Sequence, residues 1–138
     1  MLVLDTNVLS ELLRPVPAPK VLAWLGAQPM HTLFTTAITR AEMLYGVRIL
    51  PGGQRRDGLL LAVTAIFSTD LAGRVLPYDE AAADAHAEIA AQRRALGRPS
   101  SLSDLMIAGI VRSHGATLAT RNTPDFQDCG FDIVDPWG

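Results

Sequence analysis

Three acidic residues, Asp5, Glu42 and Asp104, lie beside segments in which apolar side chains dominate. Acids at a protein surface are common, so only acids next to apolar faces are informative. Clustered carboxylates raise one another's pKa unless a divalent cation holds them, and hard cations such as Mg²⁺ and Mn²⁺ prefer oxygen ligands. If the three carboxylates converge, they predict a metal site that cleaves phosphodiester bonds. The sequence spacing alone does not establish that convergence.

Asp5 directly follows the apolar run Leu2–Leu4 in MLVLDTNVLS. It precedes a helix that we expect over residues 6–13. A carboxylate at this position could serve only as the N-cap of that helix, where it accepts a hydrogen bond from a backbone N–H. Capping and metal binding are both open for Asp5 taken alone.

Glu42 lies within a helix expected over residues 37–50, on an otherwise apolar face that includes Ile38. A carboxylate on a buried face needs a partner or a cation, because burying it bare is unfavourable. The alternative to a metal is an ion pair with Arg40 or Arg48.

Asp104 lies near the start of a helix expected over residues 102–114. On its side of that helix are Ile107 and Ala108. Ser101 and Asp104 also have the spacing of a capping box, and an acid in a first turn suits the helix dipole. A structural role as a cap is therefore the alternative to metal binding.

Apolar β-branched runs alternate with segments of three- and four-residue apolar periodicity along the chain. Strands are predicted at residues 1–5, 31–37 (leading into a helix), 74–78, 116–120 and 130–136. Helices are predicted at residues 6–13, 19–27, 37–50, 54–70, 80–96 (with Asp79 as N-cap) and 102–114.

This alternating order predicts an α/β fold with a mostly parallel sheet that is covered on both faces, because parallel neighbours need crossover connections. In such sheets the site lies beyond the carboxyl ends of the strands. Asp5, Thr36 and residues 120–122 fall at such ends.

Composition narrows the class of protein. A length of 138 residues fits one domain, residues 1–138, and no apolar run approaches the ~20 residues that span a bilayer. We expect a soluble, cytoplasmic protein without membrane partners. The single cysteine, Cys129, excludes an internal disulfide and a cysteine-rich zinc site, and the net charge of −2 argues against a wholly basic surface that coats nucleic acid.

Several common active-site motifs are missing from the sequence. It has no G-x-x-x-x-G-K-[ST], G-x-S-x-G, H-E-x-x-H or G-x-G-x-x-G, which removes the local chemistry of nucleotide hydrolases, serine hydrolases, zinc proteases and dinucleotide enzymes. An aspartyl nucleophile is disfavoured because Asn7 stands two residues after Asp5. The histidines are scattered and are expected at the surface or as caps: His31, His86 and His114.

With these residues named, the chain resembles the PIN-domain nucleases, in particular the VapC-type toxins of bacterial toxin–antitoxin pairs and their FitB-like branch. The resemblance rests on segments in the family's order: LVLDTNVLSELLR, AITRAEMLYGV, LPYDE, SDLMIAG, LATRN and DIVDPW. It implies a three-layer α/β/α fold and an Mg²⁺- or Mn²⁺-dependent endoribonuclease. It also implies inhibition by a small VapB-like or FitA-like antitoxin.

Position by position, the resemblance implies metal-binding and catalytic roles for the three acids. Asp5 is similar to the family's first metal ligand, Asp104 to the acid opposite it, and Glu42 to the third acid. Thr6 and Thr120 resemble hydroxyls that order the metal shell.

The sequence departs from the family at a fourth acidic position. FitB-like members can carry Asp where this chain has Asn122, in TRNTPD. Asn offers a carbonyl oxygen but no charge, which puts a second tightly held metal in doubt. Asp125 could reach back by about one helical turn, or it could be a cap or surface acid.

Basic residues supply candidates for RNA contacts. Arg121 is a candidate phosphate contact, as are Arg55 and Arg56, for which a solvated surface is the alternative. The alanine-rich helix at residues 81–96 could pack against a second subunit, as dimerisation in this family suggests, or within the chain. We expect a homodimer or a larger hetero-oligomer with the antitoxin.

Two functions remain open at this stage. The first is an RNase toxin that an antitoxin neutralises. The second is a PIN-fold binding module that acts with a DNA-binding partner in transcriptional autoregulation, with weak or no nuclease activity.

Overall fold

Five parallel strands in the order β3-β2-β1-β4-β5 form the centre of the computed structural model, which describes residues 1–138. The strands are β1 (Leu2–Leu4), β2 (Leu33–Thr36), β3 (Val75–Leu76), β4 (Thr117–Ala119) and β5 (Ile133–Val134). The predicted parallel sheet is thus confirmed, and β1 lies at its middle.

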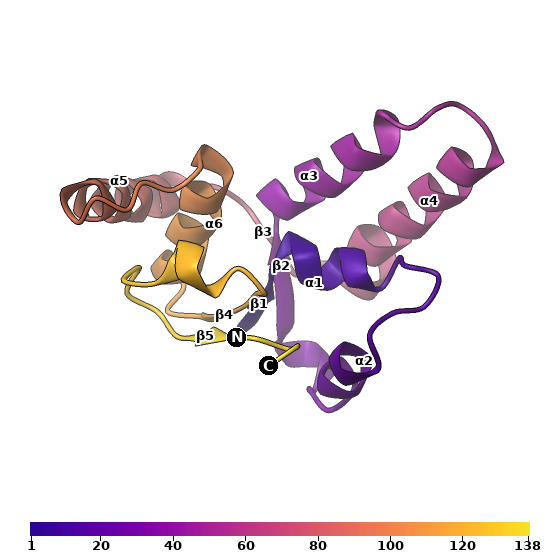
Figure 1. Cartoon of the computed structure of the whole chain (residues 1–138), viewed down its shortest axis with the longest axis horizontal. Coiled ribbons are helices and arrows are strands. Elements are labelled where there is room, and N and C mark those ends of the chain that lie inside the picture. The colour runs from indigo at the N-terminus through magenta and orange to yellow at the C-terminus, as the bar shows by residue number, and fades with distance from the viewer.

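Helices cover both faces of this sheet (Figure 1). They are α1 (Thr6–Glu11), α2 (Pro19–Gly26), α3 (Ala37–Arg48), α4 (Gln54–Ala65), α5 (Glu80–Ala95) and α6 (Leu102–Ser113), with short turns η1 (Met30–Thr32), η2 (Ile66–Asp70) and η3 (Thr123–Phe126). In Figure 1, α5 and α6 lie to one side of the strands and α1, α2 and α4 to the other. The expected three-layer α/β/α arrangement is therefore present.

Successive strand residues point to opposite faces, and this alternation produces two hydrophobic cores. Val3 and Leu118 are buried in the core that α5 and α6 cover. Their neighbours Leu4 and Ala119 are buried in the core that includes residues of α1, α3 and α4. Both faces of β1 and β4 are thus apolar, and the polar residues that follow these strands lie at the edge of the two cores.

Two helix ends differ from the sequence prediction. The helix expected over 54–70 is regular only to Ala65 and continues as the π-helical turn η2, in which Leu71 N–H donates to Ile66 O at 2.8 Å. The wider turn allows Ile66 and its neighbour Phe67 both to be buried.

The helix expected over 6–13 ends at Glu11. The buried Glu11 carboxylate accepts a hydrogen bond from Ala18 N–H at 3.1 Å and pairs with Arg14 at 3.2 Å. These contacts turn the chain into the proline-rich loop after α1. None of the helices is both long and apolar enough to cross a membrane.

The histidine prediction was wrong for His86. His31 and His114 are exposed, and His114 is the C-cap of α6. His86 lies in α5 and is half-buried. Its Nδ1 is 2.7 Å from the hydroxyl of Tyr78, which lies between β3 and α5.

Helices α5 and α6 pack very closely at Gly109. A Cβ atom at this position would lie 2.4 Å from Ala82 O and 3.0 Å from His86 Cβ. The absence of a side chain at Gly109 therefore sets the separation of the two helices, and α6 carries Asp104.

We predict that Gly109→Ala destabilises the protein, by about 1–3 kcal/mol, because the added methyl group forces the helices apart. Gly58→Ala is the matched control: Gly58 lies inside α4, and a Cβ added there would have nothing within 4 Å. That control should gain about 0.5–1 kcal/mol from helix propensity. Urea unfolding measures both, and equal stabilisation of the two variants would contradict the close packing.

Candidate active site

The strand register brings the polar ends of β1 and β4 together. Leu4 pairs with Ala119, and the next backbone contact is Asp5 N–H donating to Ala119 O at 3.0 Å. Asp5 therefore lies beside Thr120. Both residues occupy the carboxyl edge of the sheet, where ligands of parallel α/β folds bind.

Asp5 is only 4% exposed and uses its two carboxylate oxygens differently. Oδ1 accepts a hydrogen bond from Thr6 N–H at 2.8 Å, so Asp5 is the N-cap of α1. Oδ2 accepts a hydrogen bond from the Thr120 hydroxyl at 2.7 Å. The capping interpretation is confirmed, and it leaves the second oxygen for another role.

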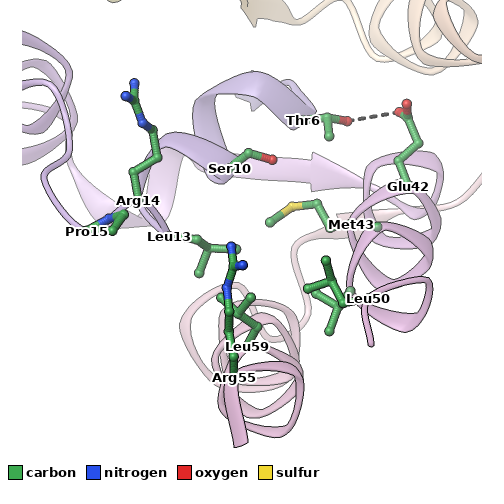
Figure 2. Close-up of a pocket in the computed structure, with 12 residues that line it drawn as sticks. Thr6, Ser10, Leu13, Arg14, Pro15, Glu42, Met43, Leu50, Arg55 and Leu59 are labelled. Carbon is green, nitrogen blue, oxygen red and sulfur yellow. Dashed lines mark hydrogen bonds between the residues drawn. The ribbon is translucent and has the colours of Figure 1, made fainter. Parts of the chain in front are cut away.

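Thr6 connects Asp5 to Glu42. Its N–H donates to Asp5, and its hydroxyl donates to Glu42 Oε1 at 2.9 Å (Figure 2). Glu42 forms no ion pair with Arg40 or Arg48, so the alternative proposed for this residue was wrong.

Glu42 is also exposed, contrary to the expectation of an apolar helix face. Helix α3 buries Thr39, Met43 and Val47 instead, which places Glu42 at the rim of the sheet edge. Its carboxylate is thus open to solvent on one side while Thr6 orients it from the other.

Asp104 lies in the first turn of α6 and is half-buried. Ser101 is the N-cap of this helix and its Oγ accepts the Asp104 N–H at 3.2 Å. Burial raises the pKa of Asp104 and the Ser101 hydroxyl opposes that rise; the charge of Asp125 raises the pKa further and that of Arg93 lowers it.

Burial and two neighbouring acids act on the Asp5 carboxylate. Burial raises the pKa of Asp5 from 3.8 to about 6, against the lowering effect of hydrogen bonds from Thr120 and Thr6. The charges of Asp104 and Glu42 add to the rise. Burial is therefore the main cause of the raised pKa of Asp5, and two acidic charges add to it.

The donor chemistry of this edge fits a hydrated hard cation. No group of three or more His, Cys, Asp or Glu side chains in the structure is placed so that it could hold a metal ion. Mg²⁺ typically keeps several waters and takes only one or two carboxylates, so a complete protein cage is not required. The acids at this edge offer oxygen ligands, and the buried Asp5 lacks a positive partner.

Asn122 and Asp125 lie in the loop and the short turn η3 that follow β4. Asn122 is exposed and starts η3, and its backbone N–H donates to Thr120 Oγ1 at 3.1 Å. Its carbonyl accepts the Asp125 N–H at 3.1 Å, which puts Asp125 one turn further on. Asp125 is exposed too, and its negative charge raises the pKa of Asp104.

Two polar residues of this network were not predicted as site residues. Asn7 Nδ2 donates to Thr120 Oγ1 at 3.2 Å, and Asn7 Oδ1 accepts the Arg121 N–H at 3.2 Å, so Asn7 ties α1 to the end of β4. Thr39 is buried with its hydroxyl 3.1 Å from that of Thr6. Two features of the sequence could have identified these residues: the polar run DTN after β1, and the threonines of TTAIT, which lie at the end of β2 and in the first turn of α3.

A groove of about 490 Å³ adjoins the acids between α1, α3 and α4. Figure 2 shows the Thr6–Glu42 contact at one end of this groove and the Arg14 and Arg55 side chains apart from it. Arg121 is exposed but turns its guanidinium to within 5.0 Å of the Trp137 ring centroid. Arg14 and Arg55 thus line the same groove as Glu42 without pairing with it.

Comparison with known proteins agrees with this geometry. The PIN domain family matches residues 2–131. The chain is 42% identical to the VapC ribonuclease Y4jK of Sinorhizobium fredii, over 99% of this chain and 98% of that protein. It is 36% identical to the toxin FitB of Neisseria gonorrhoeae, over 99% of both chains.

A solved structure of FitAB bound to a DNA fragment superposes with a TM-score of 0.94 at 36% identity, covering 100% of this chain and 96% of that one. The fold thus agrees with that of this solved structure over nearly the full length. This chain belongs to the PIN-domain family.

Proposed function

We propose that the protein is a metal-dependent endoribonuclease and the toxin of a toxin–antitoxin pair. The observation that carries this proposal is the buried Asp5, whose pKa is raised to about 6 by burial and by two neighbouring acids. Because its pKa is raised, ionisation of Asp5 at neutral pH lowers the stability of the metal-free protein. Its relatives include a VapC ribonuclease and a FitB toxin, which supports RNA as the substrate.

We propose that one or two of the carboxylates of Asp5, Asp104 and Glu42 bind the metal ion directly, with water completing the shell. Mg²⁺ or Mn²⁺ at this position supplies an activated water and neutralises charge on the phosphate. Asp5 is rigidly fixed at the sheet edge, whereas Glu42 is exposed and can adjust to the ion. Asp125 contributes the fourth acid in place of Asn122.

The neighbouring hydroxyls orient these carboxylates. Thr120 accepts hydrogen bonds from Asn7 Nδ2 and Asn122 N–H, so its own proton is directed to Asp5 Oδ2. Thr6 donates to Glu42 in the same way. Partners of this kind fix ligand geometry and typically contribute about 10–100-fold in metal affinity or activity.

RNA phosphates would be held by arginines around the acids. Arg121 follows Thr120 directly, and Arg55 lines the groove that begins at Glu42. Guanidinium groups suit phosphate because they donate two parallel hydrogen bonds. Because its substrate is cellular RNA, we assign the protein to the cytoplasm.

A small VapB-like or FitA-like antitoxin is the partner that this function requires. The chain resembles a solved structure of FitAB bound to a DNA fragment, which supports an antitoxin partner; we propose that the protein assembles as a homodimer or as a larger hetero-oligomer with that antitoxin. The same DNA complex favours a second candidate function, in which this chain acts mainly as a binding module in transcriptional autoregulation.

Cleavage of purified RNA separates the two functions. In Mg²⁺ or Mn²⁺ the wild-type protein should cleave total RNA, and EDTA should stop it. Asp5→Asn should reduce the rate of cleavage by more than about 100-fold, because it removes the charge of a metal ligand. A residue that only orients a ligand typically contributes about 10–100-fold.

The matched control is Asp84→Asn, an exposed acid of α5 away from the sheet edge, which should cleave at the wild-type rate. Intact RNA under all metal conditions, together with no growth arrest on expression, would support the binding module instead.

The raised pKa of Asp5 also predicts how stability depends on pH in the absence of metal. Between pH 3.8 and about 6 the folded protein keeps a proton on Asp5 that the unfolded chain has lost. Stability therefore falls as pH rises through this window, by about 3 kcal/mol in total at 1.36 kcal/mol per pKa unit.

Asp5→Asn removes this loss. In EDTA, the free energy of unfolding of the variant should rise relative to wild type as the pH is taken from 4 to 7, as urea titrations at each pH can measure. A constant difference between the two proteins across this range would show that the pKa of Asp5 is not raised in the folded protein.

A further inference from the structure

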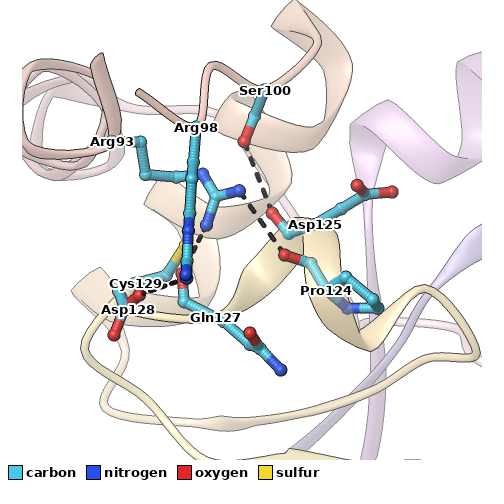
Figure 3. A network of polar contacts seen from close by, with 8 residues as sticks. All are labelled: Arg93, Arg98, Ser100, Pro124, Asp125, Gln127, Asp128 and Cys129. Atoms are coloured by element: carbon cyan, nitrogen blue, oxygen red, sulfur yellow. Dashed lines mark hydrogen bonds and ion pairs between the residues drawn. The ribbon is translucent and has the colours of Figure 1, made fainter. Parts of the chain in front are cut away.

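Two arginines hold the chain after β4 by contacts within the protein (Figure 3). Arg93 Nη1 donates to Gln127 O, and Arg98 forms an ion pair with Asp128 at 3.2 Å. Arg121, which comes earlier in the same loop, differs from both: it is exposed, and its side chain donates no hydrogen bond and forms no ion pair. Its donors are therefore free for a ligand.

The Arg121 guanidinium lies against an aromatic ring. Its Cζ is 5.0 Å from the centroid of the Trp137 ring, a distance at which a cation is attracted to the face of an indole. In the sheet, Ala119 of β4 pairs with Val134 of β5, and Thr120 N–H donates to Val134 O at 3.0 Å. This register brings the segments that follow the two strands, and with them Arg121 and Trp137, to the same edge of the sheet.

Trp137 is itself held in place. Its N–H donates to Asp135 Oδ1 at 2.9 Å, and Gly138 N–H donates to Asp135 O at 3.1 Å, which closes a tight turn. Lys20 Nζ of α2 donates to Gly138 O at 2.9 Å. The Trp137 ring is half-buried and packs against the core that includes residues of α1, α3 and α4. The segment DIVDPW therefore places a fixed indole ring beside Arg121.

The backbone of Arg121 is joined to the acidic edge of the sheet. Arg121 follows Thr120, whose hydroxyl donates to Asp5 Oδ2 at 2.7 Å. The Arg121 N–H donates to Asn7 Oδ1 at 3.2 Å, and Asn7 lies in the first turn of α1. A ligand at the Arg121 side chain would thus be a neighbour of one at Asp5.

The Arg121 guanidinium does not point at the carboxylates themselves. The pKa of Glu11, the last residue of α1, is lowered chiefly by the hydrogen bond from Ala18 N–H and also by the charge of Arg121. The charges that act on Asp5 and Asp104 do not include that of Arg121. A phosphate bound by Arg121 would therefore flank the phosphate at the acids.

We propose that Arg121 and Trp137 form a phosphate-binding subsite for RNA beside the acidic edge, in which the indole ring holds the guanidinium and a phosphate flanking the cleaved bond accepts its free donors. This inference rests on the nuclease function proposed above. Guanidinium groups donate two parallel hydrogen bonds to a phosphate, and a ring that contacts the cation uses none of those donors. Trp137 is the positioning residue, and its effect passes through Arg121.

The subsite needs no metal ion, so RNA binding in EDTA tests it, measured by fluorescence anisotropy with the full-length protein and a fluorescein-labelled single-stranded RNA oligonucleotide. Arg121→Gln should weaken binding about tenfold at low salt, because it removes a charge-assisted hydrogen bond. It should also reduce the slope of log K against log salt concentration by about 0.7, the value for one phosphate contact on a single strand. Arg94→Gln, at an exposed position of α5, is the control and should change neither quantity.

Two substitutions of Trp137 test the ring. Trp137→Phe keeps an aromatic face and should bind RNA within about twofold of wild type, whereas Trp137→Leu should lose about two- to fivefold, the size of an exposed cation–π contact. Added to Arg121→Gln, Trp137→Leu should cause no further loss of RNA affinity. Trp24→Leu is the matched control: Trp24 packs against the same core without an arginine over its ring, so its loss should change stability alone.

Unchanged RNA affinity and salt slope in Arg121→Gln would overturn the proposal, as would a loss from Trp137→Leu that persists in the Arg121→Gln background. The first result decides even if the Trp137 variants do not fold, because Arg121 lies at the surface. Wild-type protein that cleaves RNA in Mn²⁺ but does not bind it in EDTA would overturn the subsite and leave the nuclease function standing. Failure of the nuclease function would look different, since the wild-type protein would then cleave no RNA under any metal condition, whatever the RNA affinity of Arg121→Gln.

Discussion

A carboxylate buried at the middle of a parallel sheet is the constraint on which the rest of this structure depends. Asp5 extends the central strand, and its backbone continues the ladder to Ala119. The fold therefore cannot move this side chain into solvent without breaking the sheet. Burial and the charges of Asp104 and Glu42 all disfavour its ionised form. Hydrogen bonds from the polar residues around Asp5 offset only part of this rise in its pKa.

The compensation comes from hydroxyls and backbone rather than from cations. Thr6 and Thr120 donate to the two Asp5 oxygens, and no arginine or lysine pairs with it. A hydroxyl orients a carboxylate without cancelling its charge. The sheet edge is thus ordered while its carboxylates stay without a cationic partner, which fits the proposed divalent metal site. In η3, likewise, Arg93 binds backbone carbonyls and forms no ion pair with Asp125.

Periodicity and turn residues predicted the parallel sheet and the strand-end position of Asp5, because these follow from local sequence. They did not predict that Glu42 is exposed, since its apolar neighbours on α3 are only partly covered by the fold. The π-helical turn η2 arises from packing and has no local signal. Nothing in the local sequence distinguishes Arg93 from other basic residues at helix ends, because its contacts lie 31 to 34 residues further along the chain.

The most direct test of the account is a crystal structure of the wild-type protein grown with Mn²⁺, with anomalous diffraction recorded to locate the ion. The account predicts Mn²⁺ at the carboxyl edge of the sheet, bonded to oxygens of Asp5 and Asp104 at about 2–2.3 Å, with water completing its shell. An edge that stays free of Mn²⁺ while the ion binds elsewhere, or an ion that avoids Asp5, would contradict it.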